Sequence, residues 1–472
     1  MSEMLGGLVD KMGGDSPFKS FQELMEAQKS LDAGTPVPSY SGGGVGGPLL
    51  PQSIEMTLTQ ITSKAEHSVF WQKFPKDATK IKNAVHEYRR QTSLGIDLDG
   101  FAAEGSVGPS IDSVFQALYA RCKFFVHKRV VTHPMSQFDS IIGANSAIEK
   151  ANIDAADWQA RQLNMGLLWG DESANPYQFN GIAKTCVTQG NVLDMQGSPL
   201  DTKQVRDVIA NLMVAPYYGM PNKVWIAPEL QNDLDQVIFP HVRYMGADAV
   251  TMMGKTATGI NAPTKDGVVP FERDIFMSPS FKKVTAFTAL GTTYPSTPTI
   301  SVAWADLGAT GGSVFNSTDT GVYNYRIVAV GALGKSAATA AAPVTVAAAG
   351  DAAGCTIQAP GSDNVLYYSI LRTEKGGSDY YEIMKVPQHR DGLGVPDATP
   401  IVDLNAYRAN TMWCFIVQED PRVYVWKQLL DFFRIQLAMV DLNIPFAYGL
   451  YGMPLWLAPE RIYAIKNIGR AT

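Results

Sequence analysis

Residues 136–186, SQFDSIIGANSAIEKANIDAADWQARQLNMGLLWGDESANPYQFNGIAKTC, decide how the rest of the chain is interpreted. Mostly small or apolar side chains recur there at alternating gaps of three and four, which places them on one face of a single helix: Ile141, Ala144, Ile148, Ala151, Ala155, Trp158, Gln162 and Met165. Ser136 or Asp139 can cap its start, and Gly166 and Gly170 permit its end. A helix of about 28 residues spans about 40 Å, which suits a strut better than a globular core. A coiled coil is the alternative, but the stripe contains no Leu, so a leucine-type seam is disfavoured.

The composition indicates an ordered globular chain of several domains. Its 472 residues suffice for two or three domains, and 46% hydrophobic against 18% charged residues is typical of folded proteins. A net charge of −6 argues against a protein built to grip DNA. The four cysteines stand far apart without a CxxC pair, so we expect free buried thiols. We expect no signal peptide and no membrane span, because the N-terminus lacks an apolar region and Asp431, Arg434 and Asp441 interrupt the most apolar stretch.

The N-terminal region is predicted to be an arm followed by a helix. Residues 1–52 include the Gly- and Pro-rich segment SGGGVGGP at 41–48, which cannot form regular structure. A GxGxxG pattern inside it lacks both a preceding strand and a following helix, so a nucleotide site is disfavoured. Residues 53–72 predict an amphipathic helix, because their apolar side chains recur on or near one face.

Residues 80–133 are predicted to form a long β-hairpin. Stretches 80–92 and 114–132 are rich in Val, Tyr and Phe and alternate loosely as strands do. The connection between them is glycine-rich and about 20 residues long, which is unusual inside a compact domain and fits a projecting hairpin. Its acidic side chains could suggest a metal or acid–base site, but no His stands nearby, and a solvated turn is favoured.

Two further regions follow the long helix. Residues 201–291 alternate helical and strand patterns, with a short buried strand at 223–227, and predict a mixed α/β domain. Residues 292–403 carry short alternating runs such as YNYRIVAV at 323–330, which are typical of a small β-sandwich. The sequence VGALGKS at 330–336 satisfies a relaxed phosphate-loop pattern. A sandwich turn is favoured there, because Pro343 stops the helix that a phosphate loop requires.

The order of these segments resembles that of tailed-bacteriophage major capsid proteins, which share the shell fold of the Hong Kong phage type. WGD at 169–171 and NPYQFNGI at 175–182 are similar to that family's junction after the spine helix. NKVWIAPEL at 222–230 is similar to its axial domain, and YGMPLWLAP at 451–459 to its C-terminal region. The resemblance covers about residues 50–290 and 405–472. Residues 292–403 instead resemble a fibronectin type III or immunoglobulin-like domain, inserted into the capsid fold.

The resemblance implies an α+β capsid fold with a definite division of the chain. The parts are an N-terminal arm (1–52), a peripheral-domain helix (53–79), an extended hairpin loop (80–133), the spine helix and peripheral domain (134–200), an axial domain (201–291), the inserted all-β sandwich (292–403), and a return through the axial and peripheral domains (404–472). In the family the extended loop lies across the adjacent subunit. The candidate intersubunit contacts are therefore Asp97, Asp99, Phe101 and Glu104, and the candidate spine-helix residues are Ile141, Ile148, Trp158 and Met165. Residues 91–113 contain no lysine, so the covalent cross-linking that some members make from this loop is not expected.

The resemblance implies a structural, non-enzymatic protein that self-assembles into pentamers and hexamers of an icosahedral head shell. That shell would enclose double-stranded DNA without sequence-specific binding, in a virion capsid assembled in the host cytoplasm. Expected partners are further copies of the chain and scaffolding, portal and decoration proteins, with no membrane. We predict no catalytic, cofactor-binding or metal residues, because the six histidines lack metal-ligand spacing. Two alternatives stay open: an encapsulin-like cellular shell protein, and a secreted carbohydrate-active enzyme with a fibronectin-like accessory domain.

Overall fold

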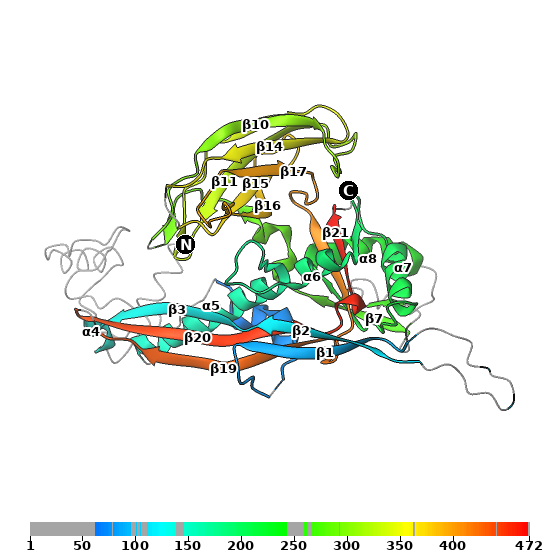
Figure 1. Cartoon of the computed structure of the whole chain (residues 1–472), viewed down its shortest axis with the longest axis horizontal. Helices are drawn as coiled ribbons and strands as arrows, with labels where there is room; N and C mark the ends of the chain where they lie inside the picture. The colour runs from blue at the N-terminus through cyan, green and yellow to red at the C-terminus, as the bar shows by residue number, and fades with distance from the viewer. Residues whose placement is uncertain are drawn as a thin grey trace, which may run out of the picture. The chain divides into compact units, whose positions relative to one another are not determined.

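The computed structural model describes residues 62–472, apart from positions 78, 96–100, 102–103, 105–110, 138–145, 243–258, 262–263, 265–266, 292, 362–363, 440 and 471–472. The predicted arm lies outside these residues, and so do Asp97, Asp99 and Ile141. Within them, the mixture of helices and strands confirms the predicted α+β class (Figure 1). No helix of the described part is long and apolar enough to span a membrane. No group of His, Cys, Asp or Glu in the same part is arranged to hold a metal ion.

The helix predicted over residues 53–72 is wrong in its described portion. A 3-10 turn, η1 (Ala65–His67), precedes a short helix, α3 (Val69–Lys73). Ser68 separates them with φ −86° and ψ 64°, a backbone conformation outside the helical region. The break allows Phe70 to enter the core, where its ring lies edge-on to Trp225 with a centroid distance of 5.0 Å. Tertiary packing therefore overrides the helical periodicity here.

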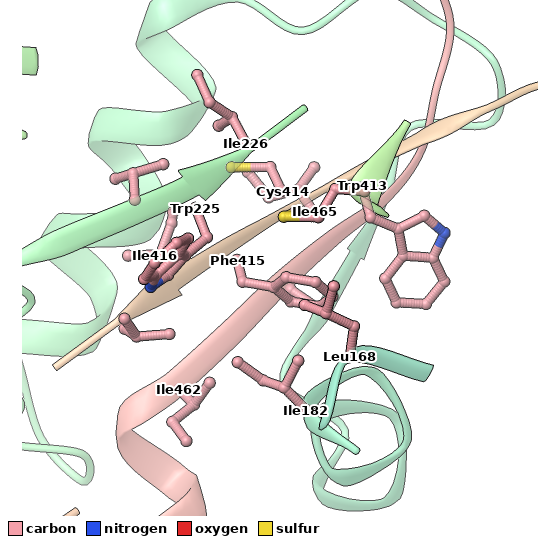
Figure 2. Packing of buried hydrophobic residues seen from close by; sticks show 14 of the residues in the cluster. Leu168, Ile182, Trp225, Ile226, Trp413, Cys414, Phe415, Ile416, Ile462 and Ile465 are labelled. Carbon is pink, nitrogen blue, oxygen red and sulfur yellow. The ribbon is translucent and has the colours of Figure 1, made fainter. Parts of the chain in front are cut away.

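The core is built on a six-stranded sheet in the order β4-β21-β18-β5-β7-β6. Its strands are β4 (Val192–Asp194), β5 (Lys223–Ile226), β6 (Gly259–Asn261), β7 (Val268–Arg273), β18 (Met412–Val417) and β21 (Ile462–Ile468). Three helices accompany it, α6 (Ile182–Gln189), α7 (Thr202–Met213) and α8 (Pro228–Val242). Every residue of β18 is buried, and Figure 2 shows Phe415 of this strand lying close to Leu168 and Ile182. The sheet is begun by residues 192–273, and β18 and β21 return into it. The chain between β7 and β18 is therefore an excursion from this core.

The two predicted hairpin strands do pair, but over a shorter length than expected. β1 (Val85–Ser93) and β2 (Val114–Arg121) are antiparallel, with Val85 opposite Arg121 and Ser93 opposite Val114. The single strand predicted over 114–132 is wrong, because it breaks at Cys122. The chain continues as β3 (Lys123–Thr132), which pairs with β20 (Asn443–Trp456), and β20 pairs in turn with β19 (Tyr424–Gln436). The buried Cys122 marks the point where the chain exchanges one strand partner for another.

The predicted spine helix is present as α5 (Ala147–Trp169), which is about 35 Å long at ~1.5 Å per residue. Its buried face differs from the predicted stripe. Trp158 is 37% exposed, whereas the leucines that the stripe left out are fully or almost fully buried. The buried side chains of the helix are Ala147, Ala155, Gln159, Leu163, Asn164, Gly166, Leu167 and Leu168. The correction has a physical reason: α5 packs against both α3 and β3, so the side that it buries is wider than one regular stripe.

The junction after α5 depends on two glycines that approach each other closely. The Gly181 N–H donates to the Gly170 carbonyl at 2.9 Å. A Cβ at Gly170 would lie 2.3 Å from the Phe179 carbonyl oxygen, and a Cβ at Gly181 would lie 2.8 Å from the Gly166 carbonyl oxygen. Only glycine fits either position, since no backbone atom can move aside as a flexible side chain can. The motif that suggested the capsid resemblance is therefore a backbone contact between α5 and α6.

The excursion between β7 and β18 contains a sandwich of two sheets. One has the order β10-β14-β17, and the other the order β8-β16-β15-β11-β12-β9, with β13 paired to β11. The bounds are β8 (Lys283–Val284), β9 (Leu290–Gly291), β10 (Ile300–Ala309), β11 (Gly321–Val330), β12 (Gly334–Lys335), β13 (Ala342–Val346), β14 (Asp351–Ile357), β15 (Tyr367–Thr373), β16 (Tyr380–Pro387) and β17 (Thr399–Asp403). The sheets share a core in which Trp304 stacks on Tyr325 with ring centroids 4.1 Å apart. Because β8 and β9 precede residue 292, the second sheet begins earlier in the chain than the predicted boundary. The immunoglobulin or fibronectin assignment stays a prediction.

The phosphate-loop pattern lies in this sandwich and opens no helix. Gly334 and Lys335 form β12, which pairs with both β9 and β11. The Ser336 hydroxyl is buried, donates to the Ala337 carbonyl and accepts from the Ala329 N–H. These bonds use the hydroxyl that a phosphate loop would offer to magnesium, which agrees with the sandwich-turn interpretation.

Candidate intersubunit contact surface

The β1–β2 ribbon presents apolar side chains that the described chain leaves uncovered. It is a two-stranded sheet of its own, and such a hairpin is marginally stable in water without packing partners. Phe115 and Tyr119 of β2 are more than two-thirds exposed. Beyond the strands, Leu94 is 81% and Phe101 94% exposed. The predicted contact residue Phe101 is therefore accessible, and so is Glu104, whereas Asp97 and Asp99 lie outside the described residues.

The base of the ribbon is anchored to the rest of the molecule. The Cys122 N–H donates to the Ala84 carbonyl at 2.7 Å, and Ile81 N–H donates to the Gln428 carbonyl at 2.9 Å. Arg90 Nη1 donates to a carboxylate oxygen of Glu460 at 2.8 Å. Buried side chains from four segments pack beneath it: Ile81, Cys122, Val425, Met453 and Leu455. The ribbon is consequently held at one end, and the described residues leave most of its apolar surface without contacts.

A second exposed apolar surface lies on the sheet β19-β20-β3. Side chains of β3 alternate between the two faces of this sheet. Phe124, Val126 and Val130 are exposed on one face, whereas Phe125 and His127 point to the face that α5 covers. β19 adds two further exposed residues to the face of Phe124, Leu430 and Ile435, which lie opposite Tyr451 and Ala447 of β20. Exposed apolar area of this extent commonly marks a protein interaction site. Sequence reasoning assigned β3 to the hairpin and therefore missed this surface.

The predicted spine residue Trp158 takes part in an aromatic group between α5 and this sheet. Its ring stacks on Phe125 at a centroid distance of 5.7 Å and lies 4.5 Å from the His127 ring. His127 also stacks on Tyr448 of β20 at 5.4 Å. Both ring nitrogens of His127 are buried and make no hydrogen bond to the described residues. Burial, with a smaller effect of the nearby Arg129 charge, lowers the pKa of His127 to about 4. The imidazole of His127 is therefore neutral in the folded state at neutral pH.

The position of α5 is also fixed by a buried polar contact. Asp274 is fully buried at the start of η2 (Ile275–Met277), and its Oδ2 accepts from the Phe70 N–H at 3.0 Å and from Asn164 Nδ2 at 2.9 Å. Its Oδ1 accepts from the Phe276 N–H at 2.8 Å. The Asn164 amide oxygen accepts in turn from the Trp71 N–H at 2.7 Å. Burial raises the pKa of the Asp274 carboxyl. One carboxylate thus joins α3, α5 and η2.

A buried ionic network joins the sandwich to the core. Arg372 of β15 donates to Asp403 Oδ2 at 2.6 Å and to Asn405 Oδ1 at 2.8 Å, and Tyr325 donates to the same Asp403 oxygen at 2.8 Å. Arg408 makes a two-point contact with Asp319, at 2.7 and 2.5 Å. The Arg408 backbone N–H donates to the amide oxygen of Asn467 in β21. The segment 403–408, which returns from the sandwich, is therefore hydrogen-bonded both to the sandwich and to β21 of the core.

The spine and loop residues predicted from sequence do not form one site. Ile148 and Met165 are half-buried at the two ends of α5, and Trp158 lies between them against β3. Phe101 and Glu104 lie beyond the ribbon. The described members of the set therefore lie on separate parts of the molecule.

Comparison with known proteins indicates which class of protein has these features. No protein-family model matches the chain. The major capsid protein of Staphylococcus phage K is 21% identical over 442 residues, which cover 89% of this chain and 90% of that protein. That of Staphylococcus phage S25-3 is 21% identical over 446 residues with the same coverage. The chain is related to phage major capsid proteins. A further capsid relative, from Enterococcus phage phiEF24C, is 25% identical over 331 residues, 67% of this chain and 68% of that protein. The resemblance to phage major capsid proteins is thereby confirmed.

Solved structures also align with this chain at low identity. The capsid of Myoviridae phage XM1 aligns with a TM-score of 0.43 and 7% identity, over 88% of this chain and 96% of that one. A structure from Mycobacterium phage Bobi aligns with a TM-score of 0.41 and 8% identity, over 89% and 95%. The SrpI encapsulin of Synechococcus elongatus aligns with a TM-score of 0.37 and 8% identity, over 90% and 94%.

Proposed function

We propose that the chain is the structural subunit of a phage head shell, in which it assembles into pentamers and hexamers of an icosahedral capsid. The observation that carries this proposal is a sequence relationship to phage major capsid proteins that spans 89% of the chain. The anchored β1–β2 ribbon and the exposed face of β3 and β19 support it, because both offer apolar surface that no described residue buries. Contacts between different patches on identical subunits close into rings when the rotation from one subunit to the next completes a full turn.

The proposal extends to the partners and location of the subunit. Its main partner is itself, with scaffolding, portal and decoration proteins as further contacts and with no membrane. The enclosed double-stranded DNA is held without sequence-specific binding, which fits the net charge of −6. The place of action is the virion capsid, after assembly in the host cytoplasm, and the role is structural rather than enzymatic. The extended-loop residues, including Asp97 and Asp99, contact the adjacent subunit.

The test is assembly of the purified full-length chain, followed by sedimentation velocity and negative-stain microscopy over a range of salt and protein concentrations. We expect closed particles. Deletion of residues 95–111 should leave a folded subunit that builds no shells, because it removes the loop that reaches the neighbour. Deletion of 391–394, an exposed turn of the sandwich, is the matched control and should leave assembly intact. A stable monomer under every condition would contradict the proposal.

The encapsulin-like alternative has one supporting observation, the distant alignment with the SrpI encapsulin. The named sequence relatives are phage proteins, which favours the head shell. The two are distinguished by cargo: particles made during infection should contain DNA, and a cellular shell would contain an enzyme. None of the named relatives supports the third alternative, a carbohydrate-active enzyme.

A further inference from the structure

A cleft of about 810 Å³ lies between the core and the sandwich, within the described residues. Its walls come from the start of β3, the C-terminal half of α5, the loop at 175–179, and the strands at the base of the sandwich. The volume falls within the range of about 300–1,000 Å³ that is typical of sites for small molecules. One glutamate, Glu382, stands among the five lysines that line the cleft. These lysines are Lys123, Lys282, Lys283, Lys335 and Lys385.

The larger sheet of the sandwich presents two of these lysines on one face. Lys335 of β12 lies opposite Val330, which lies opposite Tyr367 of β15, and Lys385 of β16 lies opposite Ser369. Residues paired across antiparallel strands share a face of the sheet, and so do residues two apart along one strand. The alternate residues of β15 point the other way, into the core of the sandwich. Lys335, Tyr367 and Lys385 are therefore directed out of the sandwich, where all three line the cleft.

Ion pairs within the described chain leave part of the positive charge of the cleft unbalanced. Three of its lysines have a carboxylate partner: Lys123 with Glu172 at 2.7 Å, Lys283 with Asp379 at 2.6 Å, and Lys385 with Glu382 at 3.6 Å. Glu382 also accepts a hydrogen bond from the Ser369 hydroxyl at 2.6 Å. Lys335 and Lys282 form no ion pair with any described carboxylate, so two positive charges remain.

Lys282 has aromatic rings beside its charge instead of an anion of its own. Its ammonium lies 3.7 Å from the centre of the Trp169 ring and 5.4 Å from that of Trp413. Burial lowers the pKa of Lys282 to about 8, an effect that the charge of Glu382 opposes and that of Lys385 reinforces. Because Glu382 is shared with Lys385, an anion bound in the cleft would compensate a charge that the chain leaves uncompensated.

The donors of the cleft favour a phosphate over a carboxylate. Its lining residues supply ammonium groups and include no arginine. Ammonium groups bind phosphate as point charges, whereas the guanidinium fork of arginine suits the planar, two-point recognition of a carboxylate. A phosphate monoester carries a charge of about −1.5 to −2 at pH 7. One such group would match the two ammonium groups that lack a carboxylate.

The remaining surface of the cleft calls for an organic part on the same molecule. The rings of Phe124 and Tyr177 line the cleft and are largely exposed. Exposed aromatic rings stack on planar groups such as nucleic-acid bases. A free phosphate ion would leave this surface unused, whereas a phosphate ester that carries a planar group would cover it.

We propose that the cleft binds a small organic phosphate of about nucleotide size, with its phosphoryl group against Lys282 and Lys335 and its planar group against Tyr177. Lys335 belongs to the sandwich and Tyr177 to the loop that follows α5, so the bound molecule contacts both walls of the cleft. This site goes beyond the shell function and does not rest on it.

Calorimetric titration of the full-length chain with AMP as the probe tests the proposal. We expect one AMP to bind per chain with a Kd of about 0.1–1 mM, as a single phosphoryl group and one stacked ring would support. Ribose 5-phosphate lacks the base and should bind at least about fivefold more weakly, since stacking on an aromatic side chain contributes about 1–3 kcal/mol. Absence of AMP binding, or equal binding of the two phosphates, would overturn the assignment. Tighter binding of an acidic peptide such as Glu-Tyr-Glu would also overturn it, in favour of a carboxylate site.

Substitutions in the cleft locate the binding. Lys282→Gln and Lys335→Gln should each weaken AMP binding by at least about tenfold, because each removes a charged hydrogen-bond donor. Lys203→Gln, an exposed residue of α7 with the same change of charge, is the control and should bind AMP normally. Tyr177→Ser should lower the affinity for AMP to that for ribose 5-phosphate and leave the latter unchanged. Circular dichroism verifies that each variant is folded, and Lys335→Gln carries the test if Lys282→Gln does not fold. Unchanged AMP binding in the folded lysine variants would refute the site.

The pH dependence of binding separates a direct contact of Lys282 from a structural role. The pKa of Lys282 is lowered to about 8, and the charged groups that act on it are Glu382 and Lys385. The phosphate of AMP stays a dianion well above its second pKa of about 6. Affinity should therefore fall between about pH 7.5 and pH 9, as Lys282 loses its proton, and Lys282→Gln should remove this fall. A fall of the same size in Lys282→Gln would contradict the contact.

Discussion

Replacement of Asp274 by alanine should destabilise the attachment of the spine helix far more than the sandwich. The carboxylate is fully buried and accepts hydrogen bonds from two backbone N–H groups and the Asn164 amide, at 2.8–3.0 Å. Its removal leaves three buried donors unpaired, each at a cost of about 1–3 kcal/mol. Part of this sum is offset because the mutant no longer has to bury a carboxylate away from water. We expect a net loss of about 3–5 kcal/mol.

Hydrogen exchange followed by mass spectrometry of the unassembled full-length chain measures this loss locally. A change of about 3 kcal/mol corresponds to a fall in protection of about 150-fold, and it should be found in peptides from α3 and α5. Peptides from β11 and β15 in the sandwich should keep their protection and serve as an internal reference.

The matched control is Asp306→Ala. Asp306 accepts from the backbone N–H groups of Gly308 and Ala347, but it is only partly buried, so water can replace the lost oxygens. We expect a change below about 1 kcal/mol. A fall of less than about threefold in the α5 peptides of Asp274→Ala, or an equal fall in the sandwich, would refute the reasoning.

Three further predictions concern other contacts. His127 has a pKa lowered to about 4, so its contribution to stability should be complete above pH 6.5 and be lost as the pH falls towards 4; His127→Phe should flatten this part of the urea midpoint against pH, and an unchanged slope would contradict it. Gly170→Ala should lower the unfolding temperature of the core by several degrees, because its Cβ would lie 2.3 Å from a backbone oxygen, whereas Gly361→Ala meets nothing within 4 Å and should leave calorimetry unchanged. Arg372→Leu leaves the Asp403 carboxylate buried without its cation, so the sandwich should lose about 3–5 kcal/mol and become sensitive to protease; resistance equal to the parent chain would refute this.

Local patterns predicted the elements that can be recognised within a short window. The alternation along β1 and β2, the helical spacing of α5 and the short strands of the sandwich all correspond to elements in the structure. A period of two identifies a strand but does not identify its partner. The break at Cys122 was therefore missed, since β2 and β3 share one alternating pattern and pair with different strands. The exposed face of β3 and β19 was missed for the same reason.

The buried face of α5 shows why the rest was not predictable from spacing. A stripe of apolar residues assumes that polar side chains face water, yet Gln159 and Asn164 are buried. Asn164 is buried because Asp274 and the Trp71 N–H bond to it, and the Asp274 contact spans 110 positions in the sequence. A polar residue and its partner can satisfy each other at any separation, so neither reveals the other in a local window.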